Sequence, residues 1–187
     1  IIGEIYKKAS IKLLLALSLQ YGLCGEIYKK LSGNESTEEN KAVCTLLIED
    51  SLKQDLDVSV TLATAWEESR FTQQSKPTRY KCIGPLQIKY QYWCPNRKGK
   101  ITITKADGEI YNCDPYYHGV RALKYYINRF KPLEKALCYY NNSKKCSKKT
   151  KYISGYVKRV LKFRKKIKVL LNKKNIQPFN QHSSVIL

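Results

Sequence analysis

The spacing of hydrophobic and polar positions predicts that most of this chain is helical. Between residues 37 and 71, apolar side chains recur every three or four positions in two successive segments, and Asp55 or Asp57 is available to cap the second. A helix is predicted to follow Pro115. Another is predicted over residues 132–140, because it begins with a proline, which suits the first turn of a helix.

Three segments interrupt the helical pattern. Residues 101–104 and 109–111 carry β-branched and aromatic side chains on either side of an Asp-Gly pair at 107–108, which predicts a β-hairpin. Polar and basic residues over 72–79 and 141–150 predict loops. The fold class that follows is α+β and mostly helical, with one small hairpin in the middle of the chain.

The two ends of the chain differ from its middle. Residues 37–171 are expected to form one domain, and residues 172–187 an extended tail. Within the segment over residues 1–36, the apolar run 13–19 follows three lysines, a pattern that suits a signal peptide or an apolar helix packed against the core or a partner. Methionine is absent even at position 1, which favours a processed product or a fragment.

Charge is distributed unevenly along the 187 residues, whose net charge is +20. Residues 1–69 hold 11 acidic and 7 basic side chains and sum to −4, whereas residues 70–187 hold 4 acidic and 28 basic ones and sum to +24. Over residues 152–171 the apolar positions form one stripe among lysines and arginines, which predicts a basic amphipathic helix. Such a field attracts a polyanion, although a solvated lysine surface has the same composition.

Seven cysteines are many for a chain of this length. The sequence contains no C-x-x-C pair and only two histidines, so it indicates neither a zinc site nor another cofactor. Disulfide bonds in an oxidising compartment are the better interpretation, and the odd number leaves at least one thiol free. The pattern does not assign the pairs.

Two adjacent carboxyl groups end the second predicted helix. Neighbouring helical side chains point about 100° apart, so Glu67 and Glu68 face different surroundings. Glu68 falls beside the apolar stripe, near Trp66 and Phe71, where burial would raise its pKa and keep it protonated, as a general acid requires. A solvated or capping glutamate would fit the same local pattern.

Further motifs follow Glu68 in order. The segment ESRF at 68–71 stands 16 residues before GPLQI at 84–88, and ALCYYN at 136–141 and the Tyr-Val pair at 156–157 come later. This series resembles the soluble, lysozyme-like lytic transglycosylases, whose pattern is E-S-x-F, then G-L-M-Q-I, then A-Y-N-A-G and finally a tyrosine. A single motif of this kind is weak, but four in the same order are specific.

The resemblance covers roughly residues 55–165 and implies a lysozyme-like fold and roles for single residues. Glu68 matches the family's only catalytic carboxylate, Ser69 the residue that helps to orient it, and Tyr156 the tyrosine whose hydroxyl approaches it. The family's substrate-contacting positions match Leu86, Gln87, Tyr140 and Asn141. Gln87, Tyr140 and Tyr156 are equally suited to hydrogen bonds at the edge of the core without a substrate role.

The chain departs from the family pattern at two places. Pro85-Leu86 stands where the family has Leu-Met, which changes the expected wall of the groove. Asn142-Ser143 replaces a small Ala-Gly pair, so sugar contacts at that point do not carry over. Neither departure affects the acid.

The resemblance implies a peptidoglycan lytic transglycosylase. Such an enzyme cleaves the β-1,4 bond between N-acetylmuramic acid and N-acetylglucosamine and forms a 1,6-anhydro sugar, with one glutamate acting first as acid and then as base. A hydrolytic lysozyme of the same fold is the first alternative, and it would need a second carboxylate such as Asp107. The second is a non-enzymatic structural or nucleic-acid-binding protein built on a decayed lysozyme-like fold.

The expected partners follow from the same observations. They are peptidoglycan glycan strands and, through the basic C-terminal half, an anionic polymer or a membrane. The cysteines favour an extracytoplasmic location, in the cell wall or periplasm, or association with a virion. The resemblance implies a component of a larger assembly, namely a phage particle or a secretion or conjugation machine.

Overall fold

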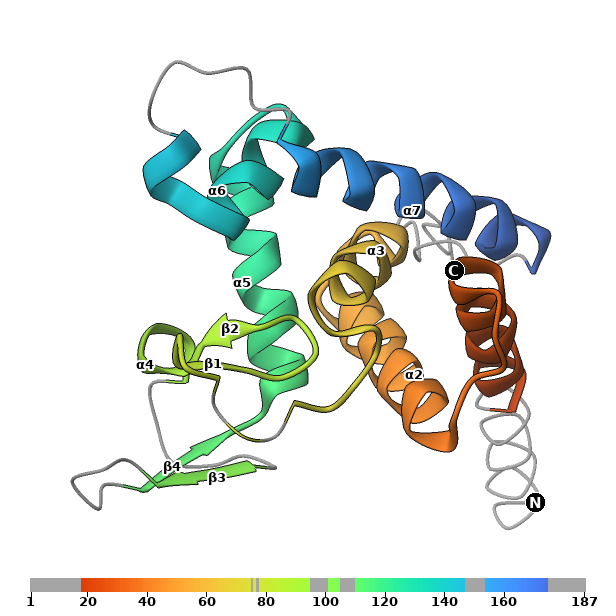
Figure 1. Cartoon of the computed structure of the whole chain (residues 1–187), viewed down its shortest axis with the longest axis horizontal. Helices are drawn as coiled ribbons and strands as arrows, with labels where there is room; N and C mark the ends of the chain where they lie inside the picture. The colour runs from red at the N-terminus through yellow and green to blue at the C-terminus, as the bar shows by residue number, and fades with distance from the viewer. Residues whose placement is uncertain are drawn as a thin grey trace, which may run out of the picture.

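Helices make up most of the structure, which is a computed structural model (Figure 1). It describes residues 18–74, 76, 78–94, 101–104, 110–146 and 154–174, with the backbone alone at 101–104, 110–112 and 143–145. The described elements in chain order are a helix over residues 18–32, α2 (Glu38–Lys53), α3 (Val58–Ser69), β1 (Cys82–Ile83), β2 (Ile88–Lys89), α4 (Tyr90–Trp93), β3 (Ile101–Thr104), β4 (Ile110–Cys113), α5 (Pro115–Arg129), α6 (Leu133–Cys146) and α7 (Gly155–Lys173). The α+β, mostly helical fold class is confirmed.

Helix α3 lies at the centre of the fold, with α2 and α7 packed against it (Figure 1). Of its 12 residues, 10 are buried, including the polar side chains of Thr61 and Thr64. The sequence predicted a single apolar stripe here, but covering helices on more than one side bury nearly the whole surface. The carboxylate of Asp57 accepts a hydrogen bond from the Ser59 amide, so Asp57 is the N-cap of α3.

The predicted helices after residue 114 are present. The Asp114 carboxylate accepts hydrogen bonds from the amides of Tyr116 and Tyr117 and caps α5, whose first residue is Pro115. Helix α7 begins after Ser154, whose hydroxyl accepts a hydrogen bond from the Val157 amide. The beginning of the predicted amphipathic stripe, over 152–153, and the tail from residue 175 lie outside the described residues.

The loop predicted over residues 141–150 is wrong at its start. Helix α6 continues to Cys146, with one non-helical residue at Asn142 (φ −158°, ψ 88°). The Cys138–Cys146 disulfide ties the end of α6 to its middle. This covalent tie is a physical reason for ordered backbone beyond Tyr140, where the sequence carries only polar and basic side chains.

Two short antiparallel hairpins complete the fold. Strand β3 pairs with β4 from Thr104↔Ile110 to Ile101↔Cys113, which confirms the predicted hairpin, although its turn lies outside the described residues. The β1–β2 pair was not predicted, because strands of two residues carry no alternation. Gly84 begins its turn with a φ of +73°, and a Cβ added there would lie 2.5 Å from the Pro115 Cβ.

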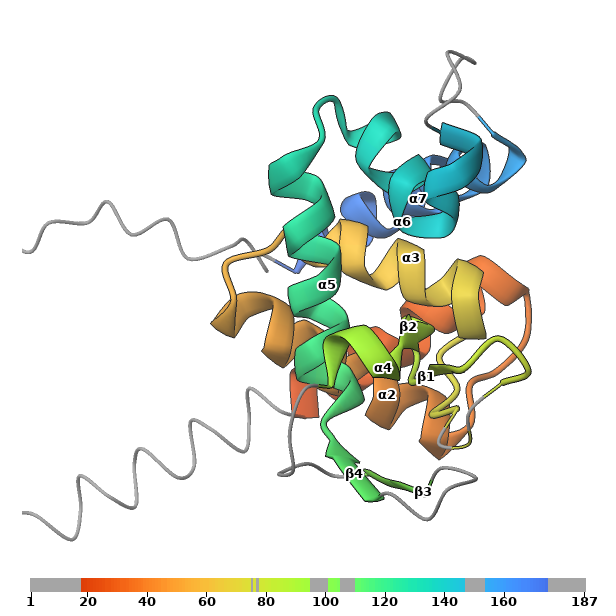
Figure 2. The same cartoon turned by 90° about the vertical axis from the view of Figure 1, so that its left-hand side faces the viewer.

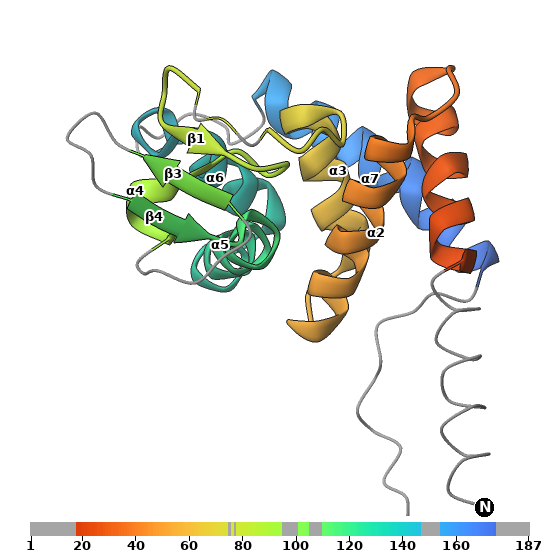
Figure 3. The same cartoon turned by 90° about the horizontal axis from the view of Figure 1, so that it is seen from below.

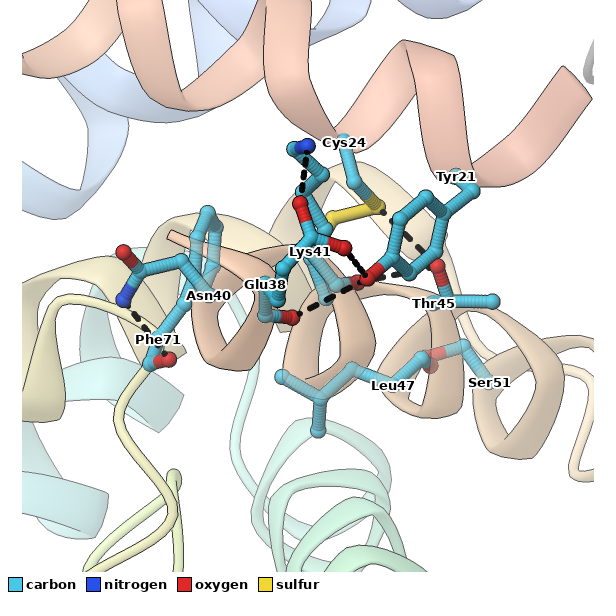
Figure 4. The surroundings of a disulfide bond; sticks show 10 residues. Tyr21, Cys24, Glu38, Asn40, Lys41, Thr45, Leu47, Ser51 and Phe71 are labelled. Atoms are coloured by element: carbon cyan, nitrogen blue, oxygen red, sulfur yellow. Dashed lines mark hydrogen bonds and ion pairs between the residues drawn. A yellow bond between two sulfur atoms is a disulfide. The ribbon is translucent and has the colours of Figure 1, made fainter. Parts of the chain in front are cut away.

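The disulfide prediction is confirmed for six of the cysteines. The pairs are Cys24–Cys44, Cys94–Cys113 and Cys138–Cys146. Cys82 is the free cysteine. Figure 4 shows the first pair joining the helix over residues 18–32 to α2, beside the hydrogen bond that the Tyr21 hydroxyl donates to the Glu38 carboxylate. Each bond restricts the unfolded chain and so stabilises the folded one.

The helix over residues 18–32 packs against the core. Leu23 and Ile27 are fully buried, and the Tyr28 ring meets Trp66 of α3 edge-on, with ring centroids 5.2 Å apart. This part of the N-terminal segment is therefore a packing element. Residues 13–17 of the apolar run lie outside the described residues. Within the part of the chain that the structure describes, no helix combines the length and hydropathy needed to cross a membrane.

Candidate active site

Glu68 lies in the last turn of α3, and the end of this helix is held from α2. Arg70 adopts the left-handed conformation (φ 57°) and ends α3. The Asn40 side-chain amide donates to the carbonyl oxygens of Arg70 (3.3 Å) and Phe71 (3.2 Å), and the second of these bonds is drawn in Figure 4. Because these carbonyls lie just beyond the helix, Asn40 fixes where α3 stops and where Glu68 stands.

The Glu68 carboxyl is largely buried and contacts α7. The Tyr156 hydroxyl donates a hydrogen bond of 2.7 Å to Glu68 Oε1. Burial raises the pKa of Glu68 from 4.5 to about 7, the Tyr156 hydrogen bond opposes this rise, and the charge of Glu67 adds to it. Near neutral pH the carboxyl therefore exists in both protonation states, and it can donate a proton and take one back.

The neighbouring Glu67 has a different environment. Arg159 donates to Glu67 Oε1 from its Nε (2.8 Å) and from a terminal nitrogen (2.7 Å), and the Glu67 side chain is only 9% exposed. Tyr156 and Arg159 stand three positions apart on α7 and so lie on one face of that helix. One face of α7 thus places the Tyr156 hydroxyl against Glu68 and the Arg159 guanidinium against Glu67. The first carboxyl has a neutral hydrogen-bond donor, whereas the second has an ion-pair partner.

A groove of about 970 Å³ opens beside Glu68. Its walls come from the end of α3, the turn before β1, the β1–β2 hairpin, α4, α5 and α6, which gather on the side of the molecule facing the viewer in Figure 2. The lining residues are Glu68, Thr78, Arg79, Tyr80, Cys82, Gln87, Ile88, Lys89, Tyr92, Trp93, Tyr126, Tyr139, Tyr140, Asn141 and Asn142. Six are aromatic, and Glu68 is the one acid among these described residues.

The structure brings five of the seven predicted site residues to this groove or to its acid. Four of them line the groove: Glu68, Gln87, Tyr140 and Asn141. The fifth, Tyr156, contacts Glu68 from α7. The Gln87 side-chain amide donates to the Gly84 carbonyl oxygen (2.9 Å), which closes the β1–β2 turn.

The remaining two predicted residues, Ser69 and Leu86, do not line the groove. Ser69 donates its hydroxyl proton to the Ala65 carbonyl oxygen (3.1 Å), one turn back in α3. A hydroxyl has a single proton, and this bond uses it. The Ser69 hydroxyl therefore does not donate a hydrogen bond that would orient Glu68. The Leu86 side chain is fully buried and is not part of the groove lining.

Leu86 instead connects the hairpin to α5 and α6. A Cβ added at Gly119 of α5 would lie 2.9 Å from Leu86 Cδ1, so the absence of a side chain at Gly119 makes room for Leu86. The Leu86 carbonyl oxygen accepts a hydrogen bond of 2.6 Å from the Tyr140 hydroxyl. Burial raises the pKa of Tyr140 well above its usual value, so this hydroxyl remains a donor at all relevant pH values.

Most of the aromatic lining was missed by sequence reasoning. Tyr126 meets Tyr140 edge-on, with ring centroids 5.6 Å apart, and Trp93 meets Tyr126 at 6.3 Å. The dense aromatic run over residues 90–93 was a signal that could have identified part of this wall. Arg79 ends the loop predicted over residues 72–79 and Tyr80 follows it, and no periodicity marks either residue.

The two other downstream acids that the structure describes, Asp114 and Glu134, do not line the groove. Asp114 caps α5, and Glu134 stands in the first turn of α6. Asp107 and Glu109 lie outside the described residues. Among the residues that the structure places, no group of three or more histidine, cysteine or acidic side chains is arranged to hold a metal ion.

Comparison with known proteins gives no family for this chain. Neither the family models, nor the curated proteins, nor the solved structures contain a match. The likeness to lytic transglycosylases therefore rests on the short ordered motifs of the sequence.

Proposed function

We propose that this protein is a peptidoglycan lytic transglycosylase of lysozyme-like fold, with Glu68 as its single acid and base. The observation that carries the proposal is the largely buried Glu68 carboxyl, with a pKa of about 7, at a groove rich in aromatic side chains. A carboxyl that is partly protonated at neutral pH suits general acid catalysis at a glycosidic oxygen.

The proposed reaction begins with proton transfer. Protonated Glu68 donates to the oxygen that links N-acetylmuramic acid to N-acetylglucosamine, and the bond from the muramic C1 to this oxygen breaks. Positive charge develops at C1, where the 2-acetamido group of the sugar stabilises it in place of an enzyme carboxylate. The Glu68 carboxylate then removes the proton of the muramic C6 hydroxyl, whose oxygen bonds to C1. The products are a 1,6-anhydro sugar and a new chain end, with no water consumed.

Two tyrosines support this cycle. The Tyr156 hydroxyl stabilises the Glu68 carboxylate after the proton has left, because a hydrogen bond to the charged form favours it. Tyr140 stands in the groove wall with its hydroxyl engaged by the Leu86 carbonyl oxygen, so its ring is the part offered to a sugar. The flat face of a sugar exposes C–H groups, and these pack well against the π face of an aromatic ring.

The remaining expectations are part of the same proposal. The net charge of +24 over residues 70–187 would concentrate the protein on anionic cell walls. The three disulfides suit an oxidising compartment outside the cytoplasm, and an enzyme that opens the wall locally suits a phage particle or a secretion or conjugation machine.

Product analysis tests the proposal. Purified peptidoglycan is incubated with the protein, with a Glu68→Gln variant and with a Glu49→Gln variant, which makes the same exchange on α2 away from the groove. We expect anhydro-muropeptides from the parent protein and from Glu49→Gln, and a loss of about 10²–10⁴-fold in rate for Glu68→Gln.

Two other products would change the conclusion. Reducing-end muropeptides, which contain one added water, would make the protein a hydrolytic lysozyme and require a second carboxylate. An absence of products from the parent protein would overturn the enzyme and favour a non-enzymatic protein that binds polyanions. Steeply salt-dependent binding of DNA, unchanged by Glu68→Gln, would support that last outcome.

A further inference from the structure

Two cations on the rim of the groove have no carboxylate partner among the residues that the structure describes. Arg79 and Lys89 both line the groove, and both are exposed. Within the described part of the chain, the Arg79 guanidinium lies over the Tyr80 ring, 4.7 Å from its centroid, and neither Arg79 nor Lys89 forms an ion pair. By contrast, Arg159 and Arg164 are each paired with a carboxylate.

The backbone places both cations on one structural unit. Arg79 lies in a turn closed by the Lys81 amide on the Thr78 carbonyl oxygen (2.8 Å), and the Thr78 amide donates to the Cys82 carbonyl oxygen (2.9 Å). Lys89 stands directly opposite Cys82 in the β1–β2 register. The turn and the strand are thus joined, and they present their cations from the same wall.

Cys82 connects this wall to the acid, because it pairs with Lys89 across the β1–β2 hairpin and feels the charge of Glu68. Burial raises the pKa of the Cys82 thiol, the Lys89 ammonium lowers it, and the Glu68 carboxyl raises it. Cys82 is therefore close to both the Lys89 ammonium and the Glu68 carboxyl. Tyr80 (64% exposed) and Tyr92 (73% exposed) also line the groove, so aromatic surface accompanies the two cations on this wall.

We propose that Arg79 and Lys89 form a carboxylate-binding subsite, which holds the acidic substituents of the muramic acid residues next to the bond cleaved at Glu68. This inference rests on the proposed function. In peptidoglycan these carboxylates belong to the peptide stems or, where a stem is missing, to the lactyl group of the sugar. An arginine and a lysine recognise carboxylates by charge and by donated hydrogen bonds, and the neighbouring tyrosines stack on the sugars.

Binding without turnover tests the subsite. A Glu68→Gln variant is titrated with soluble glycan strands in three forms: intact, freed of peptide by an amidase so that only lactyl carboxylates remain, and treated with carbodiimide and ammonia so that the carboxylates become amides. We expect about tenfold tighter binding of intact than of amidated strands, because two exposed ion pairs each contribute modestly. The amidase-treated strands show which carboxylate supplies the preference.

Matched charge removal makes the test specific. Adding Arg79→Gln and Lys89→Gln to Glu68→Gln should abolish the preference for unmodified strands. Adding Lys158→Gln and Lys162→Gln, which removes the same charge from the exposed face of α7, should leave it intact. A preference that survives the first pair, or that falls equally with the second, overturns the subsite.

Turnover by the parent protein, measured in parallel, separates this proposal from the proposed function. Anhydro products without carboxylate-dependent binding would retain the enzyme and reject the subsite. Carboxylate-dependent binding without any products would retain the subsite and reject the enzyme. Absence of both would reject both.

Discussion

Two groups of elements meet at the groove, and they use aromatic and charged side chains in opposite ways. Figure 3 shows the helix over residues 18–32 with α2, α3 and α7 on one side, and the hairpins with α4, α5 and α6 on the other. In the first group, the rings of Trp66 and Phe71 are buried and meet edge-on, 5.4 Å apart. In the second, Tyr80 and Tyr92 are largely exposed.

Charged groups follow the same division. On the first side, Arg159 and Arg164 of α7 are paired with Glu67 and Asp57 of α3 and its cap. On the second side, Arg79 and Lys89 line the groove, and neither forms an ion pair with a carboxylate among the described residues. A buried region whose charged side chains pair with one another can hold an acid with a raised pKa. An exposed wall of aromatic and cationic side chains can instead bind a polymer. The candidate site needs both.

Stability should depend far more on the first region than on the second. Phe71 is fully buried, so Phe71→Ala should lower the free energy of unfolding by about 3–5 kcal/mol through lost burial and a cavity. Tyr92→Ala, an exposed ring of the groove wall, should change it by less than about 0.5 kcal/mol. Urea denaturation measures both, and comparable losses would contradict the division.

The acid itself should reduce stability above neutral pH. The pKa of Glu68 rises from 4.5 in the unfolded chain to about 7 in the folded one, so the folded state binds more protons between these values. Stability from this group is therefore lost as pH rises through that window, by about 3 kcal/mol in total. Glu68→Gln should unfold at higher urea concentration than the parent protein at pH 8 and at the same concentration at pH 4. Equal denaturation midpoints at pH 8 would show that Glu68 is ordinarily solvated.

Removing the donor on α7 should shift the titration of the acid without destroying the fold. Tyr156→Phe deletes the hydrogen bond that lowers the pKa of Glu68, so that pKa should rise further. The carboxylate that forms after proton donation loses a charge-assisted bond, and the rate of glycan cleavage should fall about tenfold. A pH–rate profile is the measurement, and an unchanged basic limb would argue against contact between these two groups.

The smallest expected effect comes from the neighbouring carboxyl. The charge of Glu67 raises the pKa of Glu68, so Glu67→Gln should lower it and move the basic limb of the pH–rate profile to lower pH. The rate well below neutral pH should be nearly unchanged, because Glu68 is protonated there in either protein. Movement of the limb in the opposite direction would contradict the assignment. Glu49→Gln on α2 serves as the control.

Local signals in the sequence were enough to place most helices and one hairpin. Caps such as Asp57 and Asp114 act on amides two or three residues away, so the local sequence contains the signal for a cap, even where it leaves Asp55 and Asp57 as alternatives. The candidate acid could also be predicted, because Glu68 falls beside an apolar stripe and opens an ordered series of motifs. The continuation of α6 could not be predicted, because it accompanies a disulfide that the sequence leaves unassigned.

The division of roles among the site residues required the tertiary structure. Ser69 and Leu86 were assigned by motif, yet one hydroxyl bonds its own helix and the other side chain fills the space above Gly119. Both outcomes depend on rotamers and neighbours, which sequence spacing does not encode.

The sequence by itself thus determined the helical order, the hairpin, the strongly basic C-terminal half and the candidate carboxyl, since each follows from local composition. Only the tertiary structure decided which cysteines pair, that α7 gives Tyr156 to Glu68 and Arg159 to Glu67, and that aromatic and cationic residues from distant segments share one groove. The physical reason is that pKa, pairing and shape depend on what surrounds a side chain, and α7 lies about ninety residues from α3 along the chain.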